Sequence, residues 1–379
     1  MIYLDNSSTT KQADEVTRVM TEVMSEDFGN PSSLHALGLS AEKRVTAARK
    51  AIASSMSAKP DEIFFNSGGT EGDNTVLFGI AEVRKHQGKK IITSAVEHPA
   101  ILEACKVLEH RGFDVHYIGV DANCQLDMKQ LASELDDQTT LVSVMTVNNE
   151  TGAIMPIKEI AEMAHKAGAL MHTDAVQGYG KVSLKNTGAD FITVSGHKVH
   201  GPKGIGAMYA RKGINLPAFI VGGGQEKNMR SGTENVPAIA GLGTACELMG
   251  KDFVKTNAEM AQVRGYLLQG ICDQIKDIRV NSPEFGAASV LNVSFLGTRG
   301  EVILHTLEED EIYVSTGSAC SSNKKGQSHV LTAMGLNDRE IEGALRFSFS
   351  RYNTIAEMDI VLDRLNAAVT RFRKLGSFR

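Results

Sequence analysis

The sequence predicts an α/β protein whose largely parallel sheet is covered by helices on both faces. Between residues 60 and 210, short apolar runs alternate with longer amphipathic stretches, which is the pattern of successive βαβ units. Ligand sites in such sheets lie at the carboxyl ends of the strands, and several polar clusters directly follow the apolar runs. The expected strands are EIFFN (62–66), KKIITSA (89–95), FDVHYIGV (113–120), LVSVMTV (141–147), ALMHTDA (169–175), FITVSG (191–196) and IGAMYAR (205–211).

Helical stretches separate these strands, and the pattern changes after about residue 250. A long helical stretch there precedes two strand candidates and a basic C-terminal helix, which predicts a second, smaller α+β lobe. A chain of 379 residues exceeds the size at which one hydrophobic core keeps growing. We therefore expect a large domain over residues 15–250 and a small one formed by 1–14 and 251–379. The expected helices are 74–86, 98–112, 157–168, 251–275 and 358–375, and the later strands are 288–295 and 344–350.

Composition and charge are those of an ordinary globular protein, with 42% hydrophobic residues, 22% charged residues and a net charge of −5. They indicate neither direct nucleic-acid binding nor a membrane surface. The N-terminal MIYLDNSSTT lacks the basic and apolar regions of an export signal, and no apolar run reaches the ~18 residues of a membrane helix. A cytoplasmic location is expected.

The five cysteines are widely spaced and include no CxxC pair, so neither a disulfide framework nor a metal site is predicted.

The run SGGTEGDN (67–74) follows an expected strand and opens a helix, as a phosphate-binding turn does. Gly68 and Gly69 let the backbone approach a ligand closely, and the free N–H groups at a helix start favour an anion. A glycine-rich turn without a ligand is the alternative.

The run SGHKVHGPKG (195–204) sets Lys198 among small residues at the end of an expected strand. A lysine in this position can hold an aldehyde cofactor covalently, while Ser195 and His197 can donate hydrogen bonds to the phosphate of that cofactor. The alternative is a solvated surface lysine, which is the usual state of an isolated lysine.

Three further polar residues lie at the ends of expected strands. If Asp174 in HTDAVQG is buried it needs a partner, and the pyridinium nitrogen of pyridoxal is one that such chemistry requires; a helix N-cap is the alternative. His98 in VEHPA can stack on a planar ring and transfer protons, or it has a structural role. Asn149 in VNNETG lies on the same rim.

Together and in this order, the motifs resemble those of the cysteine desulfurases of the NifS/IscS type, which are fold-type I pyridoxal-phosphate enzymes of the class-V aminotransferase superfamily. The resemblance runs from LDNSSTT at the N-terminus to RFSFSRYN near the C-terminus. It implies a mostly parallel seven-stranded sheet sandwiched by helices, plus a smaller α+β domain. The motifs that carry it are GNPSSLH (29–35), SGGTEGDN, VEHPA, VNNETG, HTDAVQ, SGHKVHGPKG, RSGTENVP (230–237) and GSACSS (317–322).

The resemblance also implies a role for each candidate residue. Lys198 would hold pyridoxal 5'-phosphate as a Schiff base, and His98 would stack on the ring and serve as a proton shuttle. Arg346 would hold the substrate carboxylate, with Asn149 helping to orient it. A structural ion pair is the alternative for Arg346, which needs a buried anion in either case. The remaining cofactor contacts it implies are Gly69, Thr70, Asn149, Asp174, Gln177, Ser195, His197 and, from a neighbouring subunit of a homodimer with shared sites, Thr233.

Cys320 lies in STGSACSSNKKGQSH, a stretch of small and polar residues in which Lys324 and Lys325 favour a thiolate. The resemblance makes Cys320 the catalytic cysteine that carries sulfur as a persulfide, on a loop over about residues 315–328. The residues NKKGQ that follow it are more basic than in the commoner family pattern and include no proline, which leaves the sulfur acceptor open.

The implied function is that of a cysteine desulfurase. Such an enzyme takes sulfur from L-cysteine, releases L-alanine and passes the sulfur to an acceptor protein for iron–sulfur cluster assembly or for tRNA or cofactor thiolation. A selenocysteine lyase, which would not depend on the loop cysteine, and an aminotransferase, which would need a 2-oxo acid, are the alternatives. A scaffold without cofactor is disfavoured because both Lys198 and Asp174 are present.

Overall fold

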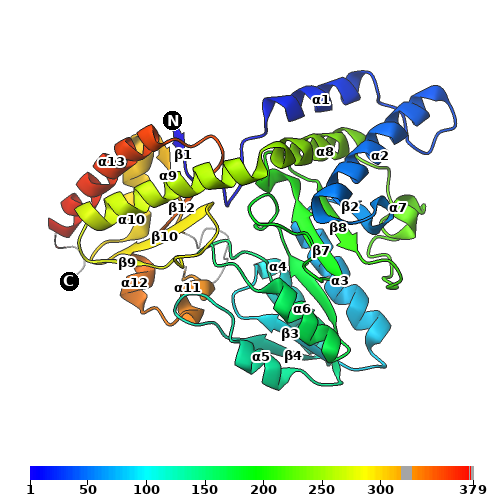
Figure 1. Cartoon of the computed structure of the whole chain (residues 1–379), viewed down its shortest axis with the longest axis horizontal. Coiled ribbons are helices and arrows are strands. Elements are labelled where there is room, and N and C mark those ends of the chain that lie inside the picture. Colours follow the sequence, from blue (N-terminus) through cyan, green and yellow to red (C-terminus); the bar gives the residue numbers. More distant parts are fainter. Residues whose placement is uncertain (317–326, 375, 377–379) are drawn as a thin grey trace.

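The computed structural model describes residues 1–316, 327–374 and 376, which form two lobes side by side (Figure 1). The larger lobe contains a seven-stranded sheet, and each of its strands overlaps a strand expected from the sequence. In chain order the strands are β2 (Ile63–Asn66), β3 (Lys90–Ser94), β4 (Asp114–Ile118), β5 (Thr139–Ser143), β6 (Leu170–Asp174), β7 (Phe191–Ser195) and β8 (Gly206–Ala210).

The strand order of this sheet is β2-β8-β7-β6-β5-β3-β4. β8 runs antiparallel to β2 and β7, whereas the other neighbouring pairs are parallel. The predicted fold class, an α/β protein with a mostly parallel seven-stranded sheet, is confirmed. Because β7, β6, β5 and β3 are parallel, their carboxyl ends share one edge, where the residues that follow them can meet.

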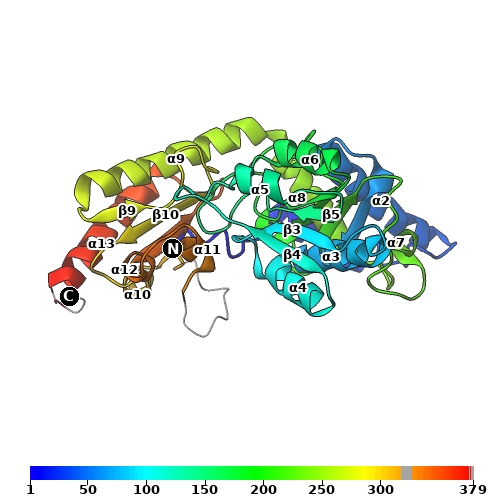
Figure 2. The same ribbon diagram turned by 90° about the horizontal axis from the view of Figure 1, so that it is seen from below.

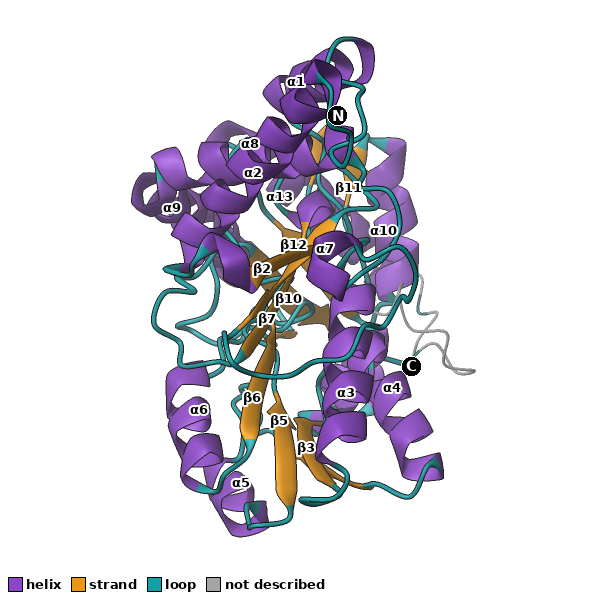
Figure 3. Cartoon of the chain, turned by 90° about the vertical axis from the view of Figure 1, so that its right-hand side faces the viewer, coloured by secondary structure: helices purple, strands orange, loops and turns teal. Residues whose placement is uncertain are grey.

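Both faces of this sheet are buried, because successive side chains of a strand point to opposite faces. In β3, Ile91 packs in one hydrophobic cluster and Ile92 in another. The helices that cover the two faces are α3 (Gly69–Arg84) and α4 (Pro99–His110) on one side, and α2 (Ala36–Met56), α5 (Met128–Glu134), α6 (Ile157–Lys166) and α8 (Val236–Lys251) on the other. Figure 3 shows α3 and α4 on the side of the sheet opposite to α5 and α6.

The strand expected over 141–147 is shifted in the structure, where β5 is Thr139–Ser143. Beyond Ser143 the chain still donates to β6, through Val144 N–H to His172 O at 3.1 Å and Thr146 N–H to Asp174 O at 2.8 Å. On its other side, however, it folds back on itself, since Met155 N–H donates to Thr146 O. The apolar run therefore extends past the strand and enters a loop at the edge where the carboxyl ends meet.

The smaller lobe is an antiparallel sheet covered by long helices. Its strand order is β12-β10-β9, with β9 (Ile278–Val280), β10 (Val290–Phe295) and β12 (Ala344–Ser348). Figure 2 shows α9 (Phe253–Gln274) running from the larger lobe along the smaller one. Its other helices are α10 (Gly300–Glu309), α11 (His329–Ala333), α12 (Asp338–Glu342) and α13 (Ile355–Lys374). None of the described helices combines the length and apolarity needed to cross a bilayer.

The first residues of the chain lie in the core of the smaller lobe. β1 (Ile2–Tyr3) pairs in parallel with β11 (Ile312–Tyr313), and Ile2 and Leu4 belong to that hydrophobic cluster. The chain then crosses to the larger lobe, where α1 (Asp14–Ser25) packs on α8 and α7 (Gln225–Asn228) lies beyond β8. The polar residues between β1 and α1 therefore bridge the two lobes.

Helices α2 and α8 pack closely at a glycine. A Cβ atom on Gly243 would lie 2.7 Å from the Cα of Ala48 in α2, a separation too short for two carbon atoms in contact. Gly250, in the same helix α8, is exposed, and a Cβ there would meet nothing within 4 Å. The close approach of the two helices thus depends on Gly243.

We expect Gly243→Ala to destabilise the fold by about 1–3 kcal/mol, because the added methyl group must push α2 and α8 apart. Gly250→Ala is the matched control and should stabilise the fold by up to about 1 kcal/mol, because alanine has the higher helix propensity. Thermal denaturation followed by circular dichroism checks both changes. Equal midpoints for the two variants would contradict the close packing.

Candidate active site

A pocket opens at the edge of the large sheet where the parallel strands end. It contains every site residue expected from the sequence except Thr233 and Cys320. Arg346 comes from the sheet of the smaller lobe, so both lobes form the pocket. The lining residues are Ser7, Ser8, Gly69, Thr70, Asp73, His98, Met145, Val147, Asn149, Asp174, Val176, Gln177, Ser195, His197, Lys198 and Arg346.

The two exceptions have different causes. Thr233 is exposed and lines another pocket, together with Ser67 and Arg230, so one chain does not bring it to Lys198. The expectation for Thr233 concerned a neighbouring subunit, and it stays a prediction. Cys320 lies outside the residues that the structure describes.

Both the side-chain amine and the backbone carbonyl of Lys198 make hydrogen bonds. It ends the single turn Gly196–Lys198 that follows β7. Its Nζ donates to the carbonyl oxygens of Ser7 at 2.5 Å and Ser8 at 2.8 Å, and its own carbonyl accepts from Nζ of Lys181 at 2.8 Å. Burial lowers the pKa of Lys181 to about 7, and the charge of Lys198 acts in the same direction. The amine of Lys198 is thus fixed in place at the floor of the pocket.

Asp174 ends β6 and His98 follows β3, two strands separated by β5, and the two side chains influence each other's charge. Asp174 ends β6 and accepts from Val176 N–H at 2.8 Å. Burial raises the pKa of Asp174, whereas the charges of His98 and Lys198 oppose that rise. Burial likewise lowers the pKa of His98. His98 Nδ1 caps α4 by accepting from Ala100 N–H at 3.1 Å, so a neutral His98 carries its proton on Nε2.

The start of α3 lines one end of the pocket, through Gly69 and Thr70. A Cβ on Gly69 would lie 2.7 Å from Cγ2 of Val176, so glycine lets the helix start lie against the end of β6. Thr70 follows in the first turn, where backbone N–H groups lack helical partners. Ser195 is buried at the end of β7, and His197 bonds Thr9 Oγ1 through Nδ1 at 3.1 Å. Burial lowers the pKa of His197 to about 4, so it is a neutral donor.

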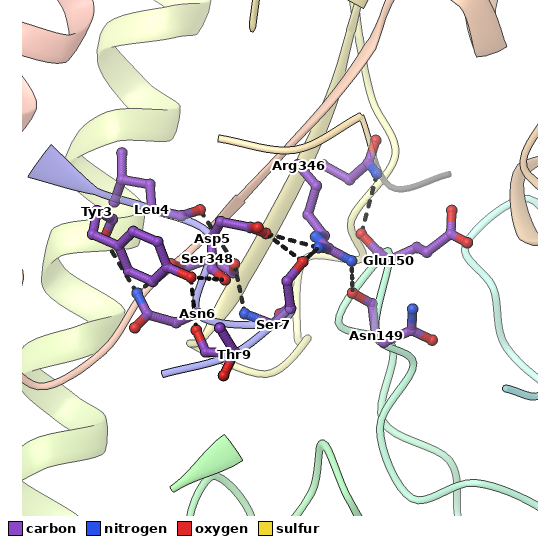
Figure 4. A network of polar contacts seen from close by, with 12 residues as sticks. Tyr3, Leu4, Asp5, Asn6, Ser7, Thr9, Asn149, Glu150, Arg346 and Ser348 are labelled. Carbon is purple, nitrogen blue, oxygen red and sulfur yellow. Dashed lines mark hydrogen bonds and ion pairs between the residues drawn. The ribbon is translucent and has the colours of Figure 1, made fainter. Parts of the chain in front are cut away.

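Arg346 is central to a polar network between the lobes (Figure 4). Its side chain is 2% exposed. Nη2 donates to Asp5 Oδ1 at 2.9 Å and to Ser8 Oγ at 2.8 Å, while Nη1 donates to the carbonyl oxygen of Asn149 at 3.1 Å. The anion that the sequence required for Arg346 is therefore supplied by Asp5, whose side chain is only partly buried.

The sequence reasoning missed the segment Asp5–Thr10 as part of the site. Besides holding Lys198 and Arg346, this segment accepts from Gln177 Nε2 at the carbonyl of Ser7, at 2.8 Å. Thr10 Oγ1 donates to the carbonyl of His197 at 2.9 Å. The only sequence signal was the run LDNSSTT, in which small polar residues follow an apolar pair.

Asp73 was also missed, although it lies in the glycine-rich motif at the start of α3. It is 1% exposed, and its Oδ1 makes no hydrogen bond with a described residue. Burial and the nearby charge of Asp174 raise the pKa of Asp73 well above its ordinary value. Burial therefore favours the neutral form of Asp73, whereas the charges of His98 and Lys198 favour the charged form of Asp174.

Comparison with known proteins shows the family to which the chain belongs. A family model described as Aminotransferase class-V matches residues 2–361. The chain belongs to the class-V aminotransferase family. It is 42% identical over 377 residues to the cysteine desulfurase IscS of Methanosarcina thermophila, with 99% of this chain and 93% of that relative covered.

Solved structures share this fold along almost the whole chain. A NifS-like protein superposes with a TM-score of 0.92 at 36% identity, covering 98% of this chain and 99% of the other. A structure described as "SspA in complex with cysteine" has a TM-score of 0.83 at 33% identity and covers 93% and 100%. Within the class-V aminotransferase family, the chain is thus a cysteine desulfurase of the NifS/IscS type, and the predicted resemblance is confirmed.

Glu97 is another buried carboxyl group, and it lies directly beside the site. Glu97, the neighbour of His98, is fully buried; its Oε1 accepts from Ser94 Oγ at 2.5 Å and from Met145 N–H at 2.9 Å. Its Oε2 has no hydrogen-bond partner among the described residues. Burial raises the pKa of Glu97 to about 8. The folded state therefore keeps a proton that the unfolded chain releases.

This raised pKa predicts a pH-dependent stability difference for Glu97→Gln. Between the ordinary value of 4.5 and about 8, the unfolded chain binds fewer protons at this position, so wild-type stability falls as the pH rises. Glutamine cannot ionise, so the variant should gain stability relative to wild type from about pH 5 to pH 8. Denaturant titrations at several pH values measure the difference. Glu103→Gln, on the exposed face of α4, is the control, and a constant offset for Glu97→Gln would refute the assignment.

Proposed function

We propose that this chain is a pyridoxal-phosphate-dependent cysteine desulfurase that converts L-cysteine to L-alanine and retains the sulfur as a persulfide on Cys320. The observation that carries the proposal is the convergence of Lys198, Asp174 and Arg346 in one buried pocket. An amine, a carboxylate and a guanidinium in one pocket match the aldehyde and ring nitrogen of the cofactor and the carboxylate of an amino acid. The full-length similarity to named cysteine desulfurases supports the same reaction.

The residues present fit pyridoxal phosphate. Lys198 would hold its aldehyde carbon, and Asp174, whose pKa is raised by burial, would pair with its protonated ring nitrogen. Thr70, Ser195 and His197 would bind the phosphate at the start of α3. When bound, this cofactor supplies an electron sink that stabilises negative charge at the substrate Cα. Thr233 of a neighbouring subunit in a homodimer would add a phosphate contact.

The chain's own residues divide the remaining work. Arg346 and Asn149 orient the substrate carboxylate, so the Cα–H bond points toward Lys198. Nζ of Lys198 then accepts the Cα proton. His98 Nε2–H donates a proton later in the reaction, as L-alanine forms. The neutral state of His98, which burial favours, makes it able to donate and recover this proton.

The sulfur step is assigned to Cys320. Its thiolate forms a bond to the substrate sulfur as the carbon–sulfur bond breaks; the carbon skeleton takes up protons and leaves as L-alanine, and the persulfide remains. Of the described cysteines, Cys105, Cys124 and Cys246 are buried with raised pKa values, and Cys272 is exposed but does not line the pocket. Thiol exchange then passes the sulfur to an acceptor protein for iron–sulfur assembly or for tRNA or cofactor thiolation in the cytoplasm.

Lys198→Ala should reduce turnover by at least about a thousandfold, because both covalent attachment of the cofactor and proton transfer depend on this amine. Some cofactor should still bind through the phosphate and Asp174 contacts. Visible absorbance before and after borohydride reduction measures covalent attachment. Lys203→Ala, at an exposed lysine nearby, is the control. A reducible adduct of unchanged stoichiometry in Lys198→Ala would assign the cofactor to another lysine.

Cys320→Ala should keep its cofactor and its spectral response to L-cysteine, yet lose persulfide formation and alanine release. The reason is that the thiolate acts only after the substrate has bound and lost its Cα proton. Intact-protein mass spectrometry and alanine measurement without added 2-oxo acid test this. Cys272→Ala, the exposed control, should behave as wild type. Desulfuration at the wild-type rate by Cys320→Ala would favour the selenocysteine lyase alternative.

A further inference from the structure

Asp5 forms a closed group with Ser8 and Arg346, two residues that line the pocket. Figure 4 shows Asp5 directed toward the guanidinium of Arg346. Asp5 Oδ1 accepts from Arg346 Nη2 at 2.9 Å and from Ser8 Oγ at 2.8 Å, and Ser8 Oγ itself accepts from the same Nη2 at 2.8 Å. Each of the three side chains therefore fixes the other two. The position of the guanidinium depends on this arrangement as much as on its own strand.

Asp5 is also the counter-charge of Arg346. Among the described residues, Asp5 supplies the one carboxylate within ion-pair distance of this guanidinium. Glu150 lies near enough for the charge of Arg346 to lower its pKa, but burial raises the pKa of Glu150 to about 7 and weakens it as an anion. Tyr3, the other titratable neighbour, has a pKa raised to about 12 and is uncharged. The pair Asp5–Arg346 is therefore close to neutral before any substrate arrives.

We propose that Asp5 is a positioning residue that sets the affinity of the site for the substrate carboxylate, by neutralising Arg346 until a second carboxylate shares it. The inference rests on the proposed role of Arg346 in substrate binding. It concerns a residue beyond those that hold the cofactor or carry out the reaction.

Two opposite effects follow from removing only the charge of Asp5. Asparagine has the same shape, and its Oδ1 can still accept from Arg346 Nη2 and Ser8 Oγ, so the guanidinium stays in place. The folded protein loses stability, because a buried guanidinium is left without its counter-ion. The site gains affinity for carboxylates, because the incoming anion is no longer repelled by Asp5. A merely structural role would instead weaken both properties together.

The decisive experiment compares L-alanine with ethylamine, which is the same molecule without its carboxylate. Binding of each to the holoenzyme is titrated through the visible absorption of the cofactor. For Asp5→Asn we expect the Kd of L-alanine to fall about three- to tenfold and the KM of L-cysteine to fall with it, without an increase in kcat. The affinity for ethylamine should not change, and the melting temperature should drop.

Two further variants separate the possible failures. Asp14→Asn removes an exposed charge from the first turn of α1 and should leave every Kd unchanged. Arg346→Ala should abolish the preference for L-alanine over ethylamine. If that preference survives in Arg346→Ala, the proposed role of Arg346 fails. If it is lost there but L-alanine does not bind more tightly to Asp5→Asn, only the inference about Asp5 fails. Should Asp5→Asn not fold, Asp5→Ser, which keeps a hydroxyl acceptor, decides the question by the same titration.

Discussion

The segment Asp5–Thr10 is the constraint on which the pocket depends. Its backbone carbonyls bind the amine of Lys198, and its carboxylate binds the guanidinium of Arg346. It also makes hydrogen bonds with the side chains of Gln177 and His197. These groups come from the large sheet and from the small one, so neither lobe contains a complete site. The polar groups of this segment are buried or partly buried, and each bond that they make between the lobes removes a group that would otherwise be unsatisfied.

Burial also decides where charge is kept in this pocket. Asp73, Glu97 and Glu150 are all buried, and their raised pKa values favour the neutral carboxyl group. Asp5 differs because it has an ion-pair partner, and Asp174 because His98 and Lys198 oppose the effect of burial. The result is a site with few fixed negative charges, so the charges of a phosphate and of an amino-acid carboxylate meet donors and cations.

Much of this could be predicted from sequence because the strands are short, apolar and separated by amphipathic helices. The strand-end rule then brought Lys198, Asp174 and His98 together correctly. It could not reveal Asp5, since an aspartate near the N-terminus has no sequence pattern that names a partner at position 346. Helix α8 was missed for a different reason: residues such as Ala238, Leu242 and Met249 are buried around most of its circumference, which removes the amphipathic period. The end of β5 was misjudged because an apolar run marks burial rather than strand pairing.

The pairing of β1 with β11 affects the order in which parts of the protein fold during synthesis. Residues 2 and 3 are synthesised long before their partners at 312 and 313. The large sheet can assemble during that interval, since its strands all lie between residues 63 and 210. The N-terminal segment, by contrast, must wait without its strand partner, because a contact of such long range closes late. Cofactor capture would then be coupled to the synthesis of residues 312 and 313, and a shorter nascent chain would not yet hold Lys198 in its working position.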